Sequence, residues 1–229
     1  MRGAANPEPG VICEDAAPPD FNGLARVYQW MEYAAFGPWL WWCRCAFLAE
    51  LADRRQALVI GDGDGRFTAR LLAANSEVRI HAIDASGAML RMLVRRAGRL
   101  AARLHLDCAD VRRWEPPAQG VDLIVTHFFL DCLTNVEVAD MALMLRSSIS
   151  PGALWVVSEF AVPQNWFGRL VGGSIVCALY WAFGWLTDLK VRQLPDHAAA
   201  LGQAGFTLLK RRRCLNGLLV SELWTARTN

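Results

Sequence analysis

From residue 57 onward, short apolar runs alternate along the chain with stretches of helical periodicity. The last of these runs, ALWVVSEF (153–160), has the continuous apolar character that is typical of a strand covered on both faces. An alternating order of strands and helices predicts a parallel sheet with crossover helices. We expect parallel strands at residues 57–61, 78–84, 104–107, 121–128 and 153–160.

The end of the chain departs from this alternation. Residues 205–214 and 218–226 form two more strand-like runs, and the Asn-Gly step at 216–217 between them is a strong hairpin signal. We therefore predict an α/β fold with a Rossmann-like, doubly wound sheet of seven strands. Its strands are mostly parallel, and it ends in an antiparallel hairpin.

The composition indicates one folded domain behind a tail. Of the 229 residues, 54% are hydrophobic, which is enough to bury one core. Residues 1–20 contain four prolines and four acids, and we expect them to be disordered. Residues 21–229 form the predicted domain, with N-terminal cap helices at 21–55 and an apolar lid insertion at 163–192.

The first predicted strand leads into VIGDGDGRF (59–67), where glycines alternate with acids. Such a loop lets backbone N–H groups at a helix N-terminus approach a ligand. Gly61, Gly63 and Gly65 do not have the spacing of the dinucleotide fingerprint, and the loop lacks the Gly-Lys-Ser/Thr of a phosphate loop. Because Asp62 and Asp64 would repel a pyrophosphate, a ligand with a positive centre fits better.

Acids also follow the next two strands. Asp84 ends the second strand, where a carboxylate can accept from both hydroxyls of a ribose. Asp110 follows the third strand and could accept from an adenine amino group. Asp62, Asp84 and Asp110 thus follow three successive predicted strands, and we expect no basic residue among them. The pattern indicates a cationic nucleoside, and S-adenosylmethionine is that ligand.

The span from Phe21 to Arg227 resembles a class I S-adenosylmethionine-dependent methyltransferase. Within that group it is similar to the ubiquinone/menaquinone-biosynthesis C-methyltransferase family. The general resemblance rests on the glycine loop, IDASGAML (83–90), CADV (108–111) and SPGALWVVSEF (150–160), and the narrower one on ARVYQWMEYAAFG (25–37) and NGLLVSELW (216–224).

The resemblance implies roles for individual residues. The three glycines would approach the methionine part, Asp84 the ribose, and Tyr28 would close over the cofactor. Val59 and Gln29 stand where the family has acids, so Asp62 would take over the contact with the ammonium group. The implied cofactor-binding residues are Tyr28, Gly61, Asp62, Gly63, Gly65, Asp84, Ala85, Met89, Asp110, Val111 and His127.

The catalytic candidates are His127 and Asp131, in THFFLDCL (126–133). Methyl transfer requires a base only where the acceptor must lose a proton. The alternatives are that His127 is a backbone-contact position and that Asp131 begins a helix.

Aromatic residues suggest the acceptor. Of 23 aromatic residues, 13 lie in residues 28–42 and 166–185, which predicts a pocket for a small hydrophobic, quinol-like or phenol-like acceptor. Ordinary packing of cap helices is the alternative. Residues 170–187 carry no charge. We interpret them as a lid, with peripheral membrane contact as a hypothesis, rather than as a membrane span.

Charge and cysteine content limit other classes. A net charge of +2 with scattered basic residues argues against nucleic-acid binding. Seven cysteines without a CxxC pair or metal-ligand spacing predict free thiols, no metal site and a cytoplasmic protein. O- or N-methylation of another hydrophobic molecule, a nicotinamide-dependent oxidoreductase and a non-catalytic adenosyl-binding module remain alternatives.

Overall fold

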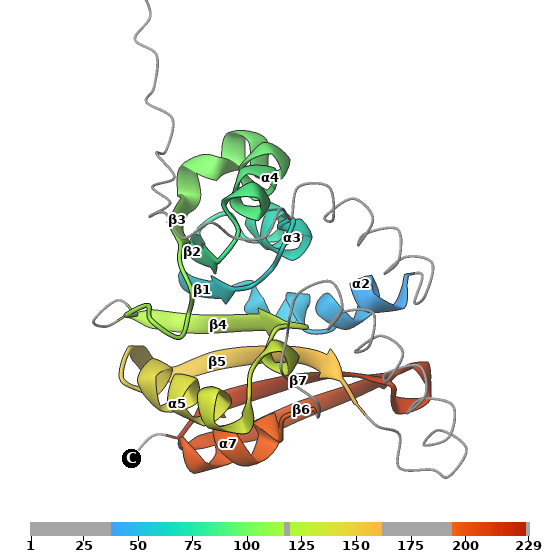
Figure 1. Cartoon of the computed structure of the whole chain (residues 1–229). Helices are drawn as coiled ribbons and strands as arrows, with labels where there is room; N and C mark the ends of the chain where they lie inside the picture. Colours follow the sequence, from blue (N-terminus) through green and yellow to red (C-terminus); the bar gives the residue numbers. More distant parts are fainter. Residues whose placement is uncertain (1–37, 117–119, 162–193, 228–229) are drawn as a thin grey trace, which may run out of the picture.

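A computed structural model describes residues 38–116, 120–161 and 194–227 of the chain (Figure 1). The strands are β1 (Gln56–Ile60), β2 (Arg79–Asp84), β3 (Leu104–Cys108), β4 (Val121–His127), β5 (Ile149–Phe160), β6 (Phe206–Cys214) and β7 (Leu219–Ala226). The helices are α2 (Trp39–Arg44), α3 (Arg66–Ala74), α4 (Gly87–Ala97), α5 (Asn135–Arg146) and α7 (His197–Gln203). Short 3-10 turns are η1 (Leu48–Leu51), η2 (Gly98–Arg103), η3 (Leu130–Cys132) and η4 (Leu215–Gly217).

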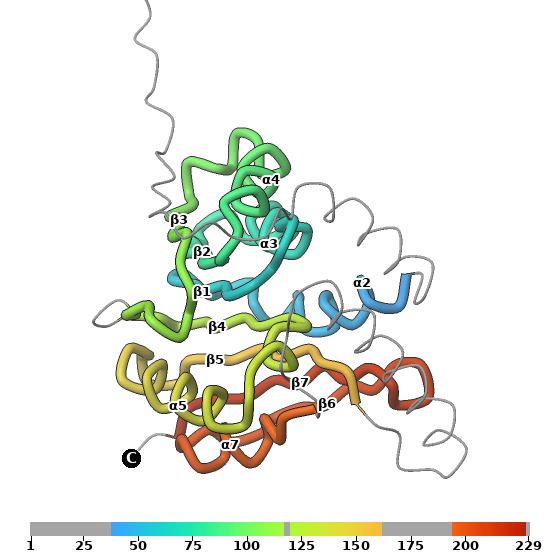
Figure 2. The backbone as a smooth tube through the Cα atoms, viewed as in Figure 1, coloured from blue at the N-terminus to red at the C-terminus, as the bar shows by residue number. Residues whose placement is uncertain are grey.

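The strands form one seven-stranded sheet in the order β3-β2-β1-β4-β5-β7-β6. β1 pairs in parallel with both β2 and β4, so the direction of strand progression reverses beside β1. β7 lies between β5 and β6 and is antiparallel to both, as the chain trace in Figure 2 shows. The predicted sheet, with its antiparallel C-terminal hairpin, is confirmed.

Each face of the sheet is covered by its own helices. Leu58 packs in the core beneath α5 and α7, whereas its neighbour Val59 packs in the core beneath α3 and α4. In Figure 1 these two pairs of helices lie beside different strands of the sheet. Because consecutive strand residues point to opposite faces, both side chains are buried, and the uninterrupted apolar runs are explained.

Local capping fixes where helices begin. The Ser86 hydroxyl accepts a hydrogen bond from the Met89 N–H at 3.4 Å and so caps the start of α4. At α5, Thr134 and Glu137 form a reciprocal capping box, which satisfies N–H groups that the first turn leaves without helical partners.

Two local expectations need correction or lie beyond the description. The strand expected at 153–160 begins earlier, because Pro151 and Gly152 lie inside β5, where pairing with β4 shifts register between Val121 and Leu123. Gly152 takes a φ of 73° there and forms a strand irregularity. Tyr28 and the lid at 163–192 lie outside the described residues. In the described part of the chain, no helix has the length and apolar character that a membrane crossing needs.

Candidate active site

The candidate site lies where β1, β2, β4 and β5 end at the same edge of the sheet. Beside β1 the crossover direction reverses, and such a reversal is where doubly wound sheets bind ligands. This edge gathers the β1–α3 loop and the last residues of β2, β4 and β5, among them Asp84, His127 and Glu159.

The three loop glycines have different surroundings. All adopt positive φ, which only glycine takes without strain. A Cβ on Gly61 would lie 2.2 Å from the Phe129 ring, and one on Gly65 would lie 2.4 Å from Leu93. A Cβ on Gly63 would meet nothing within 4 Å among the atoms described. Close packing therefore explains why glycine is needed at positions 61 and 65. At Gly63 the backbone is open to a ligand.

Asp62 is a buried carboxylate with one oxygen satisfied. Its Oδ2 accepts from the Thr68 N–H at 2.9 Å and from the Thr68 hydroxyl at 2.7 Å, which holds the first turn of α3. Its Oδ1 is buried and has no hydrogen-bond partner among the described residues. Burial raises the pKa of Asp62, and the charge of Arg44 opposes that rise. An orphaned carboxylate oxygen of this kind suits a cationic ligand group.

Asp84 lies directly beside this loop. Its Oδ1 accepts from the Ser86 N–H at 2.8 Å. Burial raises the pKa of Asp84 to about 6, the N–H groups of Ser86 and Gly63 oppose the rise, and the charge of Asp62 adds to it. The predicted ribose carboxylate and the predicted ammonium carboxylate are therefore electrostatic neighbours.

Two other acids of the region are neutralised by arginines. Asp64 Oδ2 lies 2.9 Å from Arg66 Nε and 2.7 Å from Arg96 Nη2, so it ties the loop to α4. Asp110 forms two hydrogen bonds with Arg112 Nε, at 2.9 and 3.0 Å, and its pKa is lowered by that contact. The expectation of acids without basic residues among them is therefore wrong for Asp110. Its predicted contact with adenine stays a prediction.

The remaining predicted cofactor residues follow β2 and β3. Ala85 is exposed just after β2, and its carbonyl accepts a weak hydrogen bond from the Cys108 thiol at 3.9 Å. Met89 lies in the first turn of α4. Val111 is 6% exposed and packs in the core beneath α5. Their roles at a bound nucleoside stay predictions.

His127 ends β4 as a buried, neutral ring. It is 2% exposed and packs edge-on against Phe67, with ring centroids 4.4 Å apart. Neither ring nitrogen has a hydrogen-bond partner among residues 38–116, 120–161 and 194–227. Burial, together with the charge of Arg44, lowers the pKa of His127 well below its usual value. The ring is therefore a poor proton acceptor at neutral pH. Its predicted roles at the cofactor and in catalysis stay predictions.

Asp131 lies in η3, immediately beyond β4. Burial raises the pKa of its carboxyl to about 6. The Cys132 thiol lies 3.6 Å from Asp131 Oδ1. A carboxyl with this pKa is ionised at pH 7 and is more basic than an ordinary aspartate, which fits the predicted role as a base.

Glu159 is a site residue that the sequence analysis missed. It is 2% exposed near the end of β5, and its Oε1 accepts from the N–H groups of Phe129 and Leu130 at 3.2 and 2.8 Å. Burial and the nearby charge of Asp131 raise the pKa of Glu159 well above its usual value. The Glu159 side chain therefore holds the backbone just before Asp131. An acid among the apolar residues of 153–160 was the available signal.

Cys132 lies near acids that follow different strands of the sheet. Burial raises the pKa of its thiol, and the charges of Asp131, Glu159 and Asp84 all add to the rise. Because Asp84 ends β2 and Asp131 follows β4, the predicted ribose carboxylate and the predicted base belong to one site.

Comparisons with known proteins agree with this arrangement. Residues 57–152 match the family model of a methyltransferase domain. The mitomycin 7-O-methyltransferase MmcR has a TM-score of 0.65 and 16% identity, over 90% of this chain and 60% of that one. The N-methyltransferase NodS from Bradyrhizobium japonicum WM9 was solved with S-adenosyl-L-homocysteine. It has a TM-score of 0.60 and 16% identity, over 81% of this chain and 86% of that one.

A third structure is an O-methyltransferase family 2 protein from Planctomyces limnophilus DSM 3776, solved with apigenin. It gives a TM-score of 0.65 and 16% identity, over 91% of this chain and 62% of that one. The chain thus spans less than two thirds of the length of either O-methyltransferase. The comparison with curated protein sequences gives no match.

Residues 57–152 thus match the model of a methyltransferase domain, and the chain has the fold of the solved methyltransferases. The narrower resemblance to the ubiquinone/menaquinone-biosynthesis C-methyltransferases finds no support in these matches.

Proposed function

We propose that this S-adenosylmethionine-dependent methyltransferase acts on a small hydrophobic acceptor with an aromatic hydroxyl group, a phenol or quinol. The observation that carries this proposal is the electrostatic pair of the partly buried Asp131 and the buried Glu159, because Asp131 provides a base for an acceptor that must lose a proton. A structural neighbour, the O-methyltransferase family 2 protein, was solved with apigenin, a molecule that carries phenolic hydroxyl groups.

The residues present fit the cofactor. When bound, S-adenosylmethionine supplies an electrophilic methyl group on a sulfonium. Asp62 would bind the ammonium group through its orphaned Oδ1, and Asp84 would bind the ribose hydroxyls. Gly63 would let the backbone approach the methionine part, because a side chain there would occupy open space. Arrival of a cation would also favour the ionised forms of these buried carboxyls.

Asp131 would take the proton of the acceptor hydroxyl. Its pKa of about 6 leaves it ionised at neutral pH and able to accept a proton as the oxygen becomes a nucleophile. Glu159 would keep the Phe129–Leu130 backbone in place through the two hydrogen bonds that its Oε1 accepts. Alignment supplies much of the remaining rate, since well-oriented reactants gain roughly 7–11 kcal/mol from proximity.

The test has two stages. Calorimetric titration should show S-adenosylmethionine and S-adenosylhomocysteine binding, with a nicotinamide dinucleotide as the control that does not bind. Transfer of a labelled methyl group should then be measured to phenols and quinols, with their methyl ethers as matched acceptors that have no hydroxyl proton.

We expect label only on acceptors with a free hydroxyl. Label on an amine or a ring carbon instead would support N- or C-methylation and overturn the proposed acceptor class. Cofactor binding with no turnover on any acceptor would indicate a non-catalytic adenosyl-binding module.

A further inference from the structure

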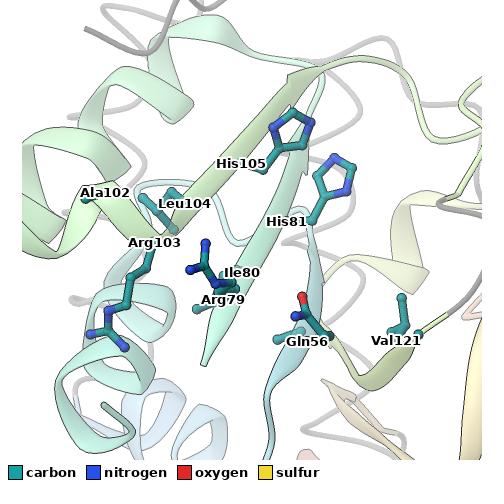
Figure 3. A pocket seen from close by; sticks show the side chains of 11 residues that line it. Gln56, Arg79, Ile80, His81, Ala102, Arg103, Leu104, His105 and Val121 are labelled. Atoms are coloured by element: carbon teal, nitrogen blue, oxygen red, sulfur yellow. The ribbon is translucent and has the colours of Figure 1, made fainter. Parts of the chain in front are cut away.

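A histidine pair lies on one face of the sheet between β2 and β3. His81 and His105 are direct partners in the parallel register of these strands. Their rings lie with centroids 4.4 Å apart, and Figure 3 shows the two side chains next to each other. His81 is largely buried, whereas the His105 side chain is 70% exposed.

Asp107 brings a carboxylate to the same pair. It lies two residues beyond His105 on β3, so its side chain points to the same face. Its Oδ2 lies 2.7 Å from His81 Nε2, and its Oδ1 lies 3.5 Å from His105 Nε2. One donor atom from each of the three side chains lies within 4.8 Å of the others.

We propose that His81, His105 and Asp107 form a binding site for a divalent transition-metal ion such as Zn²⁺. Two imidazoles and one carboxylate are donors that such ions prefer. Bonds of about 2.0–2.2 Å would place the donor atoms about 3.3 Å apart. His81 Nε2 and Asp107 Oδ2, now 2.7 Å apart, would separate slightly around an ion, and His105 Nε2, now 3.5 Å from Asp107 Oδ1, would move slightly closer.

The surroundings support metal binding rather than only a hydrogen-bonded cluster. The Trp114 indole N–H donates to Asp107 Oδ2 at 2.7 Å, and such a bond from the outer shell orients a ligating carboxylate.

An adjoining pocket leaves room for further ligands. His81 and His105 line a pocket of about 290 Å³ together with Gln56, Arg79 and Arg103 (Figure 3). Three protein ligands leave a coordination position open, which water or a small anion from this pocket would fill. The pocket lies toward the beginnings of β1 and β2, whereas Asp84, at the end of β2, belongs to the candidate active site.

A metal ion at this site would stabilise the edge of the sheet. Among the strands that the structure describes, β3 is the outermost and pairs with β2. A metal held by His81 on β2 and by two residues of β3 would link the edge strand to its neighbour. This role does not depend on the proposed methyl transfer.

The experiment uses the full chain after removal of metals with a chelator. Titration with Co²⁺ should give a visible absorption band at one ion per chain, and Zn²⁺ should abolish the band by competition. Saturating Zn²⁺ should also raise Tm, since a ligand that binds only the folded state stabilises it.

Variants assign the ion to these residues. His105→Ala should weaken Zn²⁺ binding at least tenfold while the fold is kept, because the side chain is mostly exposed. His197→Gln is the matched histidine control, since His197 instead lies 3.1 Å from Glu222 on β7. Cys108→Ser controls for thiol binding next to Asp107.

We expect both controls to bind Zn²⁺ like the unmodified chain. Binding that is unchanged in His105→Ala would overturn the site. Absence of the cobalt band in the unmodified chain would also overturn it and would leave a hydrogen-bonded cluster only. Neither result bears on methyl transfer, which is measured with a labelled methyl group.

Discussion

Two sets of acids near the same edge of the sheet have opposite electrostatic surroundings. On the β1–β3 side, Asp64 pairs with Arg66 and Arg96, and Asp110 pairs with Arg112. Beyond β4 and β5, Asp131 and Glu159 have raised pKa values. No lysine or arginine in the described part of the chain forms an ion pair with either of them.

The difference separates structural charges from groups that exchange protons. A carboxylate beside arginine stays ionised at all physiological pH values and can hold loops and helices together. A buried carboxyl without a cation binds a proton more tightly and can exchange it near neutral pH. Asp62 and Asp84 lie between these extremes, because they are buried but near N–H groups, and a cationic ligand would complete their surroundings.

The largest expected effect is on the proton-exchanging side. Asp131→Asn should lower kcat on a phenolic acceptor by about 10²–10⁴, the usual contribution of a general base. Its Kd for S-adenosylhomocysteine should stay within twofold. Steady-state kinetics and calorimetry measure the two quantities. An unchanged kcat would remove Asp131 from the reaction.

A second comparison concerns the two acids assigned to the nucleoside. Asp84→Ala should weaken S-adenosylmethionine binding about 100-fold, because two charge-assisted hydrogen bonds of about 1.5 kcal/mol each are lost. Asp110→Ala should have a smaller effect, since Arg112 already binds both carboxylate oxygens. Calorimetric titration of both variants ranks them, and a reversed order would contradict the assignment of Asp84 to the ribose.

The glycines allow stability to be separated from binding. Gly61→Ala should lower the free energy of unfolding by about 2–3 kcal/mol, because its Cβ collides with the Phe129 ring at a positive φ. Gly63→Ala should cost only about 1 kcal/mol, from backbone strain alone, yet should weaken cofactor binding. Urea unfolding and titration test both variants. Equal losses of stability would argue against the contact with Phe129.

The smallest expected effect is a pH dependence of stability. Glu159 has a raised pKa in the folded state, so its stabilising contribution is present below its unfolded pKa and is lost as pH rises through the folded value. Glu159→Gln removes this loss. Relative to the wild type, its free energy of unfolding should rise by about 1 kcal/mol between pH 5 and pH 8.

Urea unfolding at both pH values measures the gain from Glu159→Gln. Glu137→Gln is the control: contacts with Thr134 lower the pKa of Glu137 in the folded state, so this variant should not show the gain in stability with rising pH that is expected of Glu159→Gln. Identical pH dependence in Glu159→Gln and wild type would contradict the raised pKa.

Local patterns in the sequence were sufficient for the sheet and for part of the site. Strand positions follow from apolar runs, and Ser86 is a cap because of its position before an amphipathic stretch. Asp84 could be placed because the end of a parallel strand has a fixed location in such a sheet. These inferences use residues that are near each other in the chain.

Contacts between distant segments were not available to that reasoning. Glu159 binds the backbone of Phe129, 30 residues earlier, and Asp64 binds Arg96, 32 residues later. His81 and His105 are 24 positions apart, so metal-ligand spacing in the sequence could not reveal them. Only the register of β2 against β3 makes them neighbours.

The position of β7 has a consequence for biosynthesis. β6 leaves the ribosome before β7, yet β7 separates it from β5 in the finished sheet. β6 therefore has no strand to pair with until residues 219–226 have emerged, and the edge of β5 stays unpaired for the same interval. This half of the protein should complete its folding only after translation of β7, and the nascent chain exposes an apolar strand edge until then.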